Sequence, residues 1–265
     1  MRRPARLGAA ALLATALVTA PAGPAGLALA LDHGNLDEGR PVRLEDPYAI
    51  ASGEIALEAG PAFLARRGEG DLGAMAIAVQ YGLLPNLQAE LGSTFLSDPG
   101  AEAGEGRSGD VRLGALYNLN QETRLVPALG FRAGMTYPSG PGSRGLDVRL
   151  KTMVAKSAGR LGVHLNAAWE RLDGTARGER DTRREAAIGV AWPAGAPRHT
   201  RTLLVGDLFV EQSAARGARR VTGVEAGFRH QLARRLVIDG AVGRELRGPD
   251  DRLSLFASTG VSLSF

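Results

Sequence analysis

The chain has 265 residues, of which 44% are hydrophobic and 23% are charged, and its formal net charge is +4. It contains no cysteine, which excludes a disulfide framework and thiolate metal sites. The charge forms no basic stripe with interleaved aromatic residues, so the composition argues against nucleic acid as a partner.

Residues 1–30 have the pattern of a secretory signal peptide. Three arginines precede residue 7, an apolar run continues to about residue 20, and small residues extend to Ala30. Pro21 and Pro24 interrupt the stretch, which disfavours a transmembrane anchor. We therefore expect cleavage after Ala30 and export of residues 31–265 from the cytoplasm.

Residues 31–50 are polar and show no hydrophobic period. Gly34, Gly39, Pro41 and Pro47 interrupt any regular element in this stretch. We expect an irregular segment in the periplasm, ahead of the first strand. The sequence leaves open the alternative that residues 32–48 fold into a barrel lumen as a plug.

From residue 51 to residue 265 the chain consists of short segments of alternating hydrophobicity separated by turn residues. This pattern predicts an all-β fold, a transmembrane antiparallel up-and-down β-barrel of about 12 strands. A hydropathy scan misses such strands because lipid-facing and lumen-facing residues cancel. The expected strands are 51–65, 71–82, 87–97, 108–118, 122–137, 145–156, 159–172, 184–193, 201–212, 219–230, 234–245 and 252–265.

The expected connections alternate in length. Those after the second, fourth, sixth and tenth strands are tight, as at 83–86, 118–121, 157–158 and 231–233, whereas most others are longer and rich in charged residues and glycine. The connection at 193–200 is an exception to this alternation. Short periplasmic turns and long extracellular loops are typical of outer-membrane barrels.

Aromatic residues support the same register, because most of them fall on one face near the strand ends. Two belts of amphipathic rings suit a wall that crosses both membrane interfaces. Phe131 falls mid-membrane, and Phe209 and Phe256 fall inward without an explanation. The belt residues are Tyr81, Tyr117, Trp192, Phe228 and Phe265 at the periplasmic side, and Phe63, Phe95, Tyr137 and Trp169 at the extracellular side.

The last segment alternates from Leu253 to Phe265, with apolar residues on one face and small or polar residues on the other. A final strand that ends in Phe resembles the terminal signature of bacterial outer-membrane barrels. The resemblance implies that the barrel-assembly machinery recognises the strand ending at Phe265 and that outer-membrane lipid surrounds the protein.

Charged and polar residues occupy the face opposite the lipid-facing one. Facing lipid, each Arg or Lys would cost about 2–4 kcal/mol at the membrane midplane, so these residues are expected inside. Two interpretations remain: compensating salt bridges that fill the interior, which we favour for most of them, or a polar conduit that selects solutes. The lumen-lining candidates are Glu58, Glu90, Arg112, Arg132, Asp147, Arg149, Lys151, His164, Glu170, Asp207, Glu225, Arg229 and Asp239.

No catalytic constellation stands out. His164 lies mid-strand with Asn166 on the same face, but the same-face neighbours Gly162 and Ala168 supply neither a nucleophile nor a second base. No glycine-rich phosphate loop and no metal-ligand spacing is present in the sequence. We expect no catalytic residue, no cofactor and no metal.

Residues 38–54, Glu-Gly-Arg-Pro-Val-Arg-Leu-Glu-Asp-Pro-Tyr-Ala-Ile-Ala-Ser-Gly-Glu, lead directly into the first strand. This stretch and the turn Tyr81-Gly-Leu-Leu-Pro-Asn86 resemble a bacterial family of outer-membrane transporters linked to the meta-cleavage pathway of phenol degradation. The resemblance implies a barrel of about this strand number in the outer membrane that admits small hydrophobic or aromatic compounds. It carries no catalytic or ligand residue over to this chain.

The leading hypothesis is a channel or transporter that passes a small solute through a narrow, charged lumen. Twelve strands enclose much less space than the sixteen to eighteen strands of general porins, so conductance is expected to be small. The first alternative is a non-conducting structural or surface-interaction barrel. A hydrolase is the second, disfavoured by the missing partner of His164.

Overall fold

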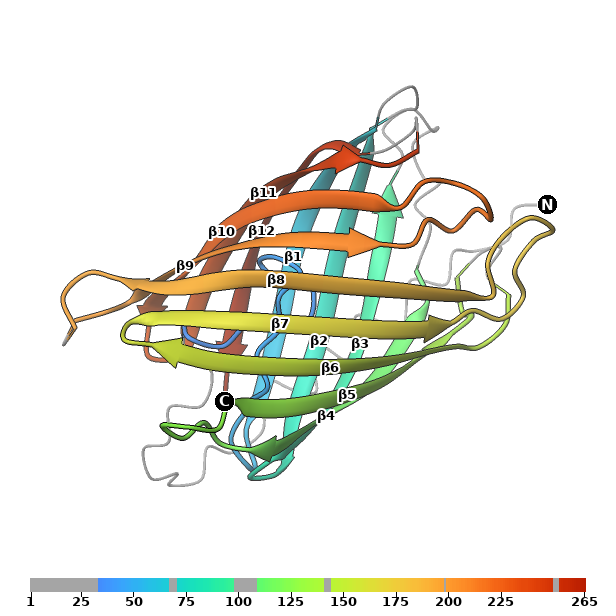
Figure 1. Cartoon of the computed structure of the whole chain (residues 1–265). Helices are drawn as coiled ribbons and strands as arrows, with labels where there is room; N and C mark the ends of the chain where they lie inside the picture. Colours follow the sequence, from blue (N-terminus) through green and yellow to red (C-terminus); the bar gives the residue numbers. More distant parts are fainter. Residues whose placement is uncertain (1–32, 67–70, 98–108, 141–143, 198, 250–252) are drawn as a thin grey trace, which may run out of the picture.

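The computed structural model describes residues 33–66, 71–97, 109–140, 144–197, 199–249 and 253–265. Twelve antiparallel strands form one closed barrel in which each strand pairs with its neighbours in sequence and β1 pairs with β12 (Figure 1). The expected all-β, up-and-down barrel of 12 strands is confirmed. Within the described residues, no helix is long and apolar enough to cross a membrane. The expected signal peptide lies outside the described residues.

The strands are 10 to 13 residues long, which is about the length that a tilted strand needs to cross a bilayer. Their bounds are β1 Ile55–Arg66, β2 Leu72–Leu84, β3 Leu87–Ser97, β4 Val111–Asn120, β5 Ala128–Tyr137, β6 Asp147–Ala158, β7 Leu161–Arg171, β8 Thr182–Ala194, β9 Thr202–Glu211, β10 Val221–Ala233, β11 Leu236–Arg247 and β12 Leu253–Ser264.

Most strands begin and end within a few residues of the positions expected from the sequence, but β5 does not. The expected strand 122–137 begins only at Ala128, because residues 121–127 form a longer connection. Side chains satisfy the backbone there: Asn120 Nδ2 donates to the carbonyl of Pro127, and Thr123 Oγ1 accepts from the amide of Val126. The alternating residues before Ala128 are therefore held by local polar contacts instead of sheet pairing.

The two ends of the barrel are named here by their connections. The turn end carries the connections β2–β3, β4–β5, β6–β7, β8–β9 and β10–β11, three of which are the two-residue turns 85–86, 159–160 and 234–235. The loop end carries the other connections, such as the ten residues between Arg171 and Thr182. Whether the loop end faces the cell exterior stays a prediction.

Large apolar side chains cover the outer face of the wall. Along β9, for example, Leu204 and Leu208 are exposed while Leu203, Val205 and Asp207 are buried. A water-soluble protein would not expose such a continuous apolar band, whereas hydrocarbon requires one. The exposed aromatic residues include Phe63, Tyr81, Phe95, Tyr117, Phe131, Tyr137, Trp192, Phe228 and Phe265.

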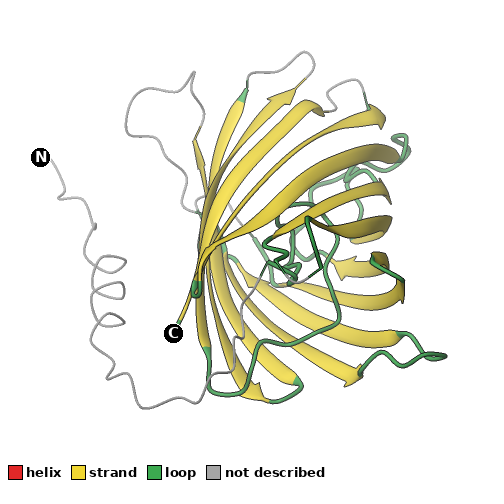
Figure 2. Cartoon of the chain, turned by 90° about the vertical axis from the view of Figure 1, so that its left-hand side faces the viewer, coloured by secondary structure: helices red, strands yellow, loops and turns green. Residues whose placement is uncertain are grey.

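The N-terminal segment, residues 33–50, belongs to no strand of the barrel and lies inside it. Leu36, Val42 and Leu44 pack with inward residues of the wall such as Phe209, and irregular segments are visible within the ring of strands (Figure 2). The expectation of a periplasmic segment is therefore corrected for residues 33–50, and the plug alternative describes them. The physical reason is that docking removes Leu36, Val42 and Leu44 from water, while contacts with the wall, described below, pair the charges of the segment.

The exterior gives a first test of the membrane-spanning fold. Ile188 is half exposed at the middle of β8, so Ile188→Arg places a charge at the centre of the apolar band. We expect this variant to lose about 2–4 kcal/mol of folding free energy in lipid, measured by denaturant titration in vesicles. The matched control Leu146→Arg, next to the loop-end start of β6, should cost only about 0–1 kcal/mol. Equal losses for the two variants would contradict a bilayer-spanning band.

Candidate functional site

The inward charges of the wall are separated by sign around the barrel. Strands β4 to β6 carry mainly cations, and strands β8 to β11 carry mainly anions. The exceptions are Asp147 and Arg183 near the loop end, and Arg229 on β10. The cations are Arg112, Arg132, Arg149 and Lys151, and the anions are Glu185, Asp207, Glu211, Glu225, Asp239 and Glu245.

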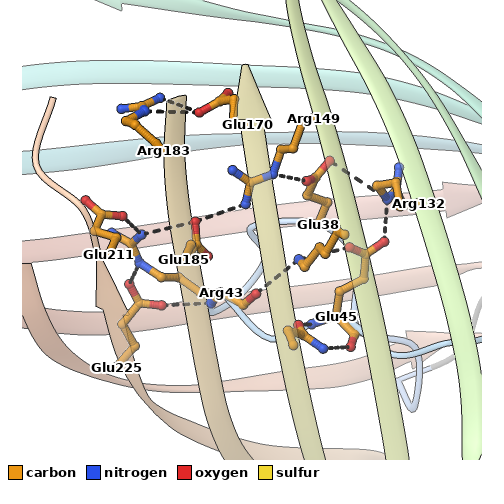
Figure 3. Close-up of polar contacts among 12 residues, drawn as sticks. Glu38, Arg43, Glu45, Arg132, Arg149, Glu170, Arg183, Glu185, Glu211 and Glu225 are labelled. Atoms are coloured by element: carbon orange, nitrogen blue, oxygen red, sulfur yellow. Dashed lines mark hydrogen bonds and ion pairs between the residues drawn. The ribbon is translucent and has the colours of Figure 1, made fainter. Parts of the chain in front are cut away.

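Acidic side chains of the N-terminal segment meet the cationic part of the wall. Arg132 Nε donates to Glu45 Oε1 at 2.5 Å, and Lys151 Nζ lies 3.0 Å from Glu45 Oε2. Glu38 lies 3.3 Å from Arg149 and 3.8 Å from Arg132 (Figure 3). Because Glu45 is 1% exposed, its charge depends on these partners for stabilisation.

Basic side chains of the same segment meet the anionic part of the wall. Arg43 Nη1 donates to Glu211 at 2.5 Å and Arg43 Nε to Glu225 at 3.2 Å, while Glu185 lies 3.9 Å away (Figure 3). The Arg43 guanidinium also stacks 3.8 Å above the ring centroid of Phe209. This contact with Arg43 explains why Phe209 faces inward, which the sequence alone did not explain.

A second group of contacts holds the segment near the turn end. Arg229, which is 0% exposed, donates to Asp37 at 2.6 Å and lies 3.8 Å from Glu58. Arg40 donates to Asp239 at 2.7 Å. The segment thus bridges cationic and anionic parts of the wall, and these contacts place an opposite charge beside the buried Asp37, Glu45 and Arg229.

Side chains of the wall also form hydrogen bonds with the backbone of the segment, which pairs with no strand. The amide of Glu45 donates to Asn166 Oδ1 at 2.7 Å, and Asn166 Nδ2 donates back to the carbonyl of Glu45 at 2.9 Å. The amides of Arg43 and Ile50 donate to Glu225 and Gln88. These contacts fix one irregular backbone conformation inside the barrel.

Glycines of the wall permit this close approach. A Cβ at Gly130 would lie 2.7 Å from Pro47 Cα, and one at Gly260 would lie 1.6 Å from the guanidinium of Arg40. A larger residue at Gly130 would displace the backbone of the segment, and one at Gly260 would move the Arg40 side chain. The wall is therefore shaped for residues 33–50 in their present position.

Neighbouring cations keep Glu38 ionised. Burial alone would raise the pKa of Glu38, but Arg132, Lys151 and Arg149 hold this pKa at about 2. Glu38 therefore carries its negative charge throughout the physiological pH range.

Asp46 behaves in the opposite way. Burial raises the pKa of Asp46 to about 8, although the amides of Leu36 and Tyr48 donate to its carboxylate at 2.7 and 2.8 Å. The charges of Asp37 and Glu45 act in the same direction as burial. At pH 7 Asp46 is accordingly neutral when the segment is docked.

A cavity of about 380 Å³ remains between the segment and the loop end. Glu38 and Arg43 of the segment form part of its lining, with charged wall residues and the apolar side chains of Leu64 and Phe256. This lining position accounts for the inward direction of Phe256. The charged wall residues of this lining are Glu90, Arg112, Arg149, Lys151, Glu170, Glu185, Glu225 and Glu245.

The sequence-predicted lumen residues fall into three groups. Asp147 stands alone near the loop end, where its carboxylate accepts a hydrogen bond from the amide of Asp173. Glu90, Arg112, Arg149, Lys151, Glu170 and Glu225 border the cavity. Glu58, Arg132, His164, Asp207, Arg229 and Asp239 are buried in the interior, most of them beside the segment.

Sequence reasoning missed the segment's own site residues, above all Asp37, Glu38, Arg40, Arg43 and Glu45. The one available signal was the dense mixture of acidic and basic residues between positions 37 and 46, which a solvated linker does not require. Glu185 and Glu211 had the inward parity, but nothing in the sequence linked them to Arg43.

The described residues do not assemble a catalytic group around His164. Its Nδ1 is buried and has no hydrogen-bond partner in the described part of the chain, so no base–orienter pair forms there. In the same residues, no group of three or more His, Asp or Glu could hold a metal ion.

Known structures share this architecture. The barrel superposes on an outer membrane channel from Pseudomonas putida F1 with a TM-score of 0.64 and 16% identity, covering 83% of this chain and 98% of that chain. It superposes on the NanC porin with a TM-score of 0.55 and 12% identity, covering 80% and 98%. The chain has the fold of a bacterial outer-membrane β-barrel. No protein-family model and no curated protein matches the sequence.

Arg132 provides a test of how the segment is held. Arg132→Met leaves the buried Glu45 with Lys151 as its remaining cation, which should weaken docking by about 3–5 kcal/mol. We expect the segment to leave the lumen and trypsin to cleave after Arg43, as detected by mass spectrometry. The matched control Arg112→Met, which borders the cavity without an ion pair to any described residue, should stay protected. Protection of both variants would contradict ion-pair docking.

Asp46 provides a test by pH. Its pKa rises from an ordinary value of 3.8 in the released segment to about 8 when docked, so docking weakens as the pH rises between these values. Tryptic cleavage after Arg43, corrected with a reference peptide, should therefore increase from pH 7 to pH 8.5.

Asp46→Asn should remove this pH dependence because the amide stays neutral. Glu38→Gln is the control: with a pKa of about 2, Glu38 is ionised at both pH values, so its loss should leave the slope unchanged. A slope that survives Asp46→Asn would show that another group titrates.

Proposed function

We propose that this protein is an outer-membrane channel for a small solute, with residues 33–50 as a displaceable plug. The observation that carries the proposal is that the segment fills the lumen through side-chain contacts and joins no strand of the barrel. Because β1 to β12 close without it, the wall would persist when the segment leaves. The likeness in fold to an outer membrane channel and to a porin supports this proposal.

The lining supports a solute with both polar and apolar parts. A solute from the loop end would first enter the cavity, where charged residues lie beside Leu64 and Phe256. Beyond the plug it would pass between the cationic strands β4 to β6 and the anionic strands β8 to β11. Charges of both signs in a narrow passage favour small dipolar molecules over simple ions. The resemblance to transporters of the phenol pathway adds small aromatic compounds as candidates.

A non-conducting structural barrel is the second candidate. It is favoured by the number of contacts that hold residues 33–50 and by the complete burial of Leu44 and Ile50. In that case the segment would be a permanent part of the core.

Single-channel recording in a planar bilayer separates the two functions. We expect residues 31–265 to give small or infrequent current steps, and the chain without residues 31–50 to give larger, sustained steps. Heat-modifiable gel mobility checks that both proteins are folded.

Arg43→Gln extends the comparison without a deletion, since it removes a cation shared by Glu211 and Glu225. Current steps of the Arg43→Gln variant should be more frequent than those of the unchanged protein. Silence of all three folded proteins would contradict the channel and support the structural barrel.

A further inference from the structure

The outer surface of the barrel has a hollow of about 650 Å³ across strands β3 to β8. Small side chains stand there among large ones: Ala133 pairs with Ala115 on one side and with Leu150 on the other. The volume lies within the range of about 300–1,000 Å³ that is usual for small-molecule sites. The outward residues that line it include Ala133, Leu150, Ala167, Trp169 and Arg184.

Arg184 lies at one end of this hollow, near the loop end of β8. It is directly opposite Trp169 in the sheet and shares the outward parity of the exposed Ile188 and Trp192. Arg184 is exposed and forms no ion pair or side-chain hydrogen bond within the described part of the chain. Near the interface an outward guanidinium costs only about 0–1 kcal/mol, so Arg184 can stay there and is available to an anion.

We propose that this hollow binds an acidic lipid, with an acyl chain along Ala133 and Ala167 and the headgroup phosphate on Arg184. The apolar floor suits a hydrocarbon chain, and a guanidinium binds phosphate oxygens through two parallel hydrogen bonds. Trp169 lies between the two parts of the site, where its ring contacts the chain below the headgroup.

The charge complementarity decides in favour of a lipid as the occupant. A protein partner within the membrane would need no anion beside Arg184, whereas an acidic lipid supplies an anion and a chain in one molecule. The hollow is separate from the lumen, so the site does not depend on channel function.

Fluorescence quenching tests this site, because the chain has two tryptophans and Trp192→Phe leaves Trp169 alone. The variant chain is refolded into phosphatidylcholine vesicles that contain a small fraction of phosphatidic acid with brominated chains. We expect this lipid to quench Trp169 several-fold more than the same fraction of brominated phosphatidylcholine does.

Arg184→Gln should abolish the preference for phosphatidic acid, and Arg184→Lys should retain part of it. Arg220→Gln, which removes an exposed arginine at the loop end beside β10, should leave the preference unchanged. Ala133→Leu, which fills the hollow, should lower quenching although Arg184 is intact.

Equal quenching by the two brominated lipids would overturn the proposal, and so would a preference that survives Arg184→Gln. Full quenching in folded Ala133→Leu would overturn the part of the proposal that places an acyl chain in the hollow.

Discussion

The rest of the structure depends on the closure of the sheet, in which backbone hydrogen bonds join β1 to β12. In hydrocarbon no water is available to unpaired N–H and C=O groups, so a spanning sheet must have no free edge. Closure forces every strand to present alternate residues to lipid and to the interior. The apolar exterior and the charged interior are two consequences of this one geometry.

The interior then has to accommodate charges that cannot face lipid. A wall with cations on β4 to β6 and anions on β8 to β11 pairs some of them between its own strands, as in Arg132–Glu90 at 2.9 Å and Arg149–Glu185 at 3.0 Å. Residues 33–50 bring Glu38 and Glu45 to the cations and Arg43 to the anions. Removing one partner of a buried ion pair leaves the other charge buried and uncompensated, which destabilises the folded state more than replacing both partners would. The charges of the wall and those of the segment therefore depend on each other.

The barrel was predictable from sequence because its information is local. Alternation within about ten residues identifies a strand, and the parity of aromatic residues gives its register. The error at β5 arose where Asn120 and Thr123 compete with the sheet for backbone groups. Such competition leaves the alternating pattern intact and is visible only in the structure.

The plug could not be predicted in this way because its information is non-local. Arg43 finds Glu225 at a separation of 182 residues, and Arg229 finds Asp37 at 192. No period marks such contacts, and the segment's conformation follows the shape and charge of the wall. Phe209 and Phe256 broke the inward polar pattern for the same reason, since they serve the segment and its cavity.

The positions of these contacts also fix the order in which the structure can form. The segment precedes β1 in the chain, but Arg43 requires anions from β8, β9 and β10 together, and Arg40 requires Asp239 on β11. Its binding site exists only after those strands have assembled. Docking in this position therefore requires paired strands, and its reversal need not disturb the ring. This separation between a permanent wall and a charge-held segment makes displacement of the segment compatible with an intact membrane barrel.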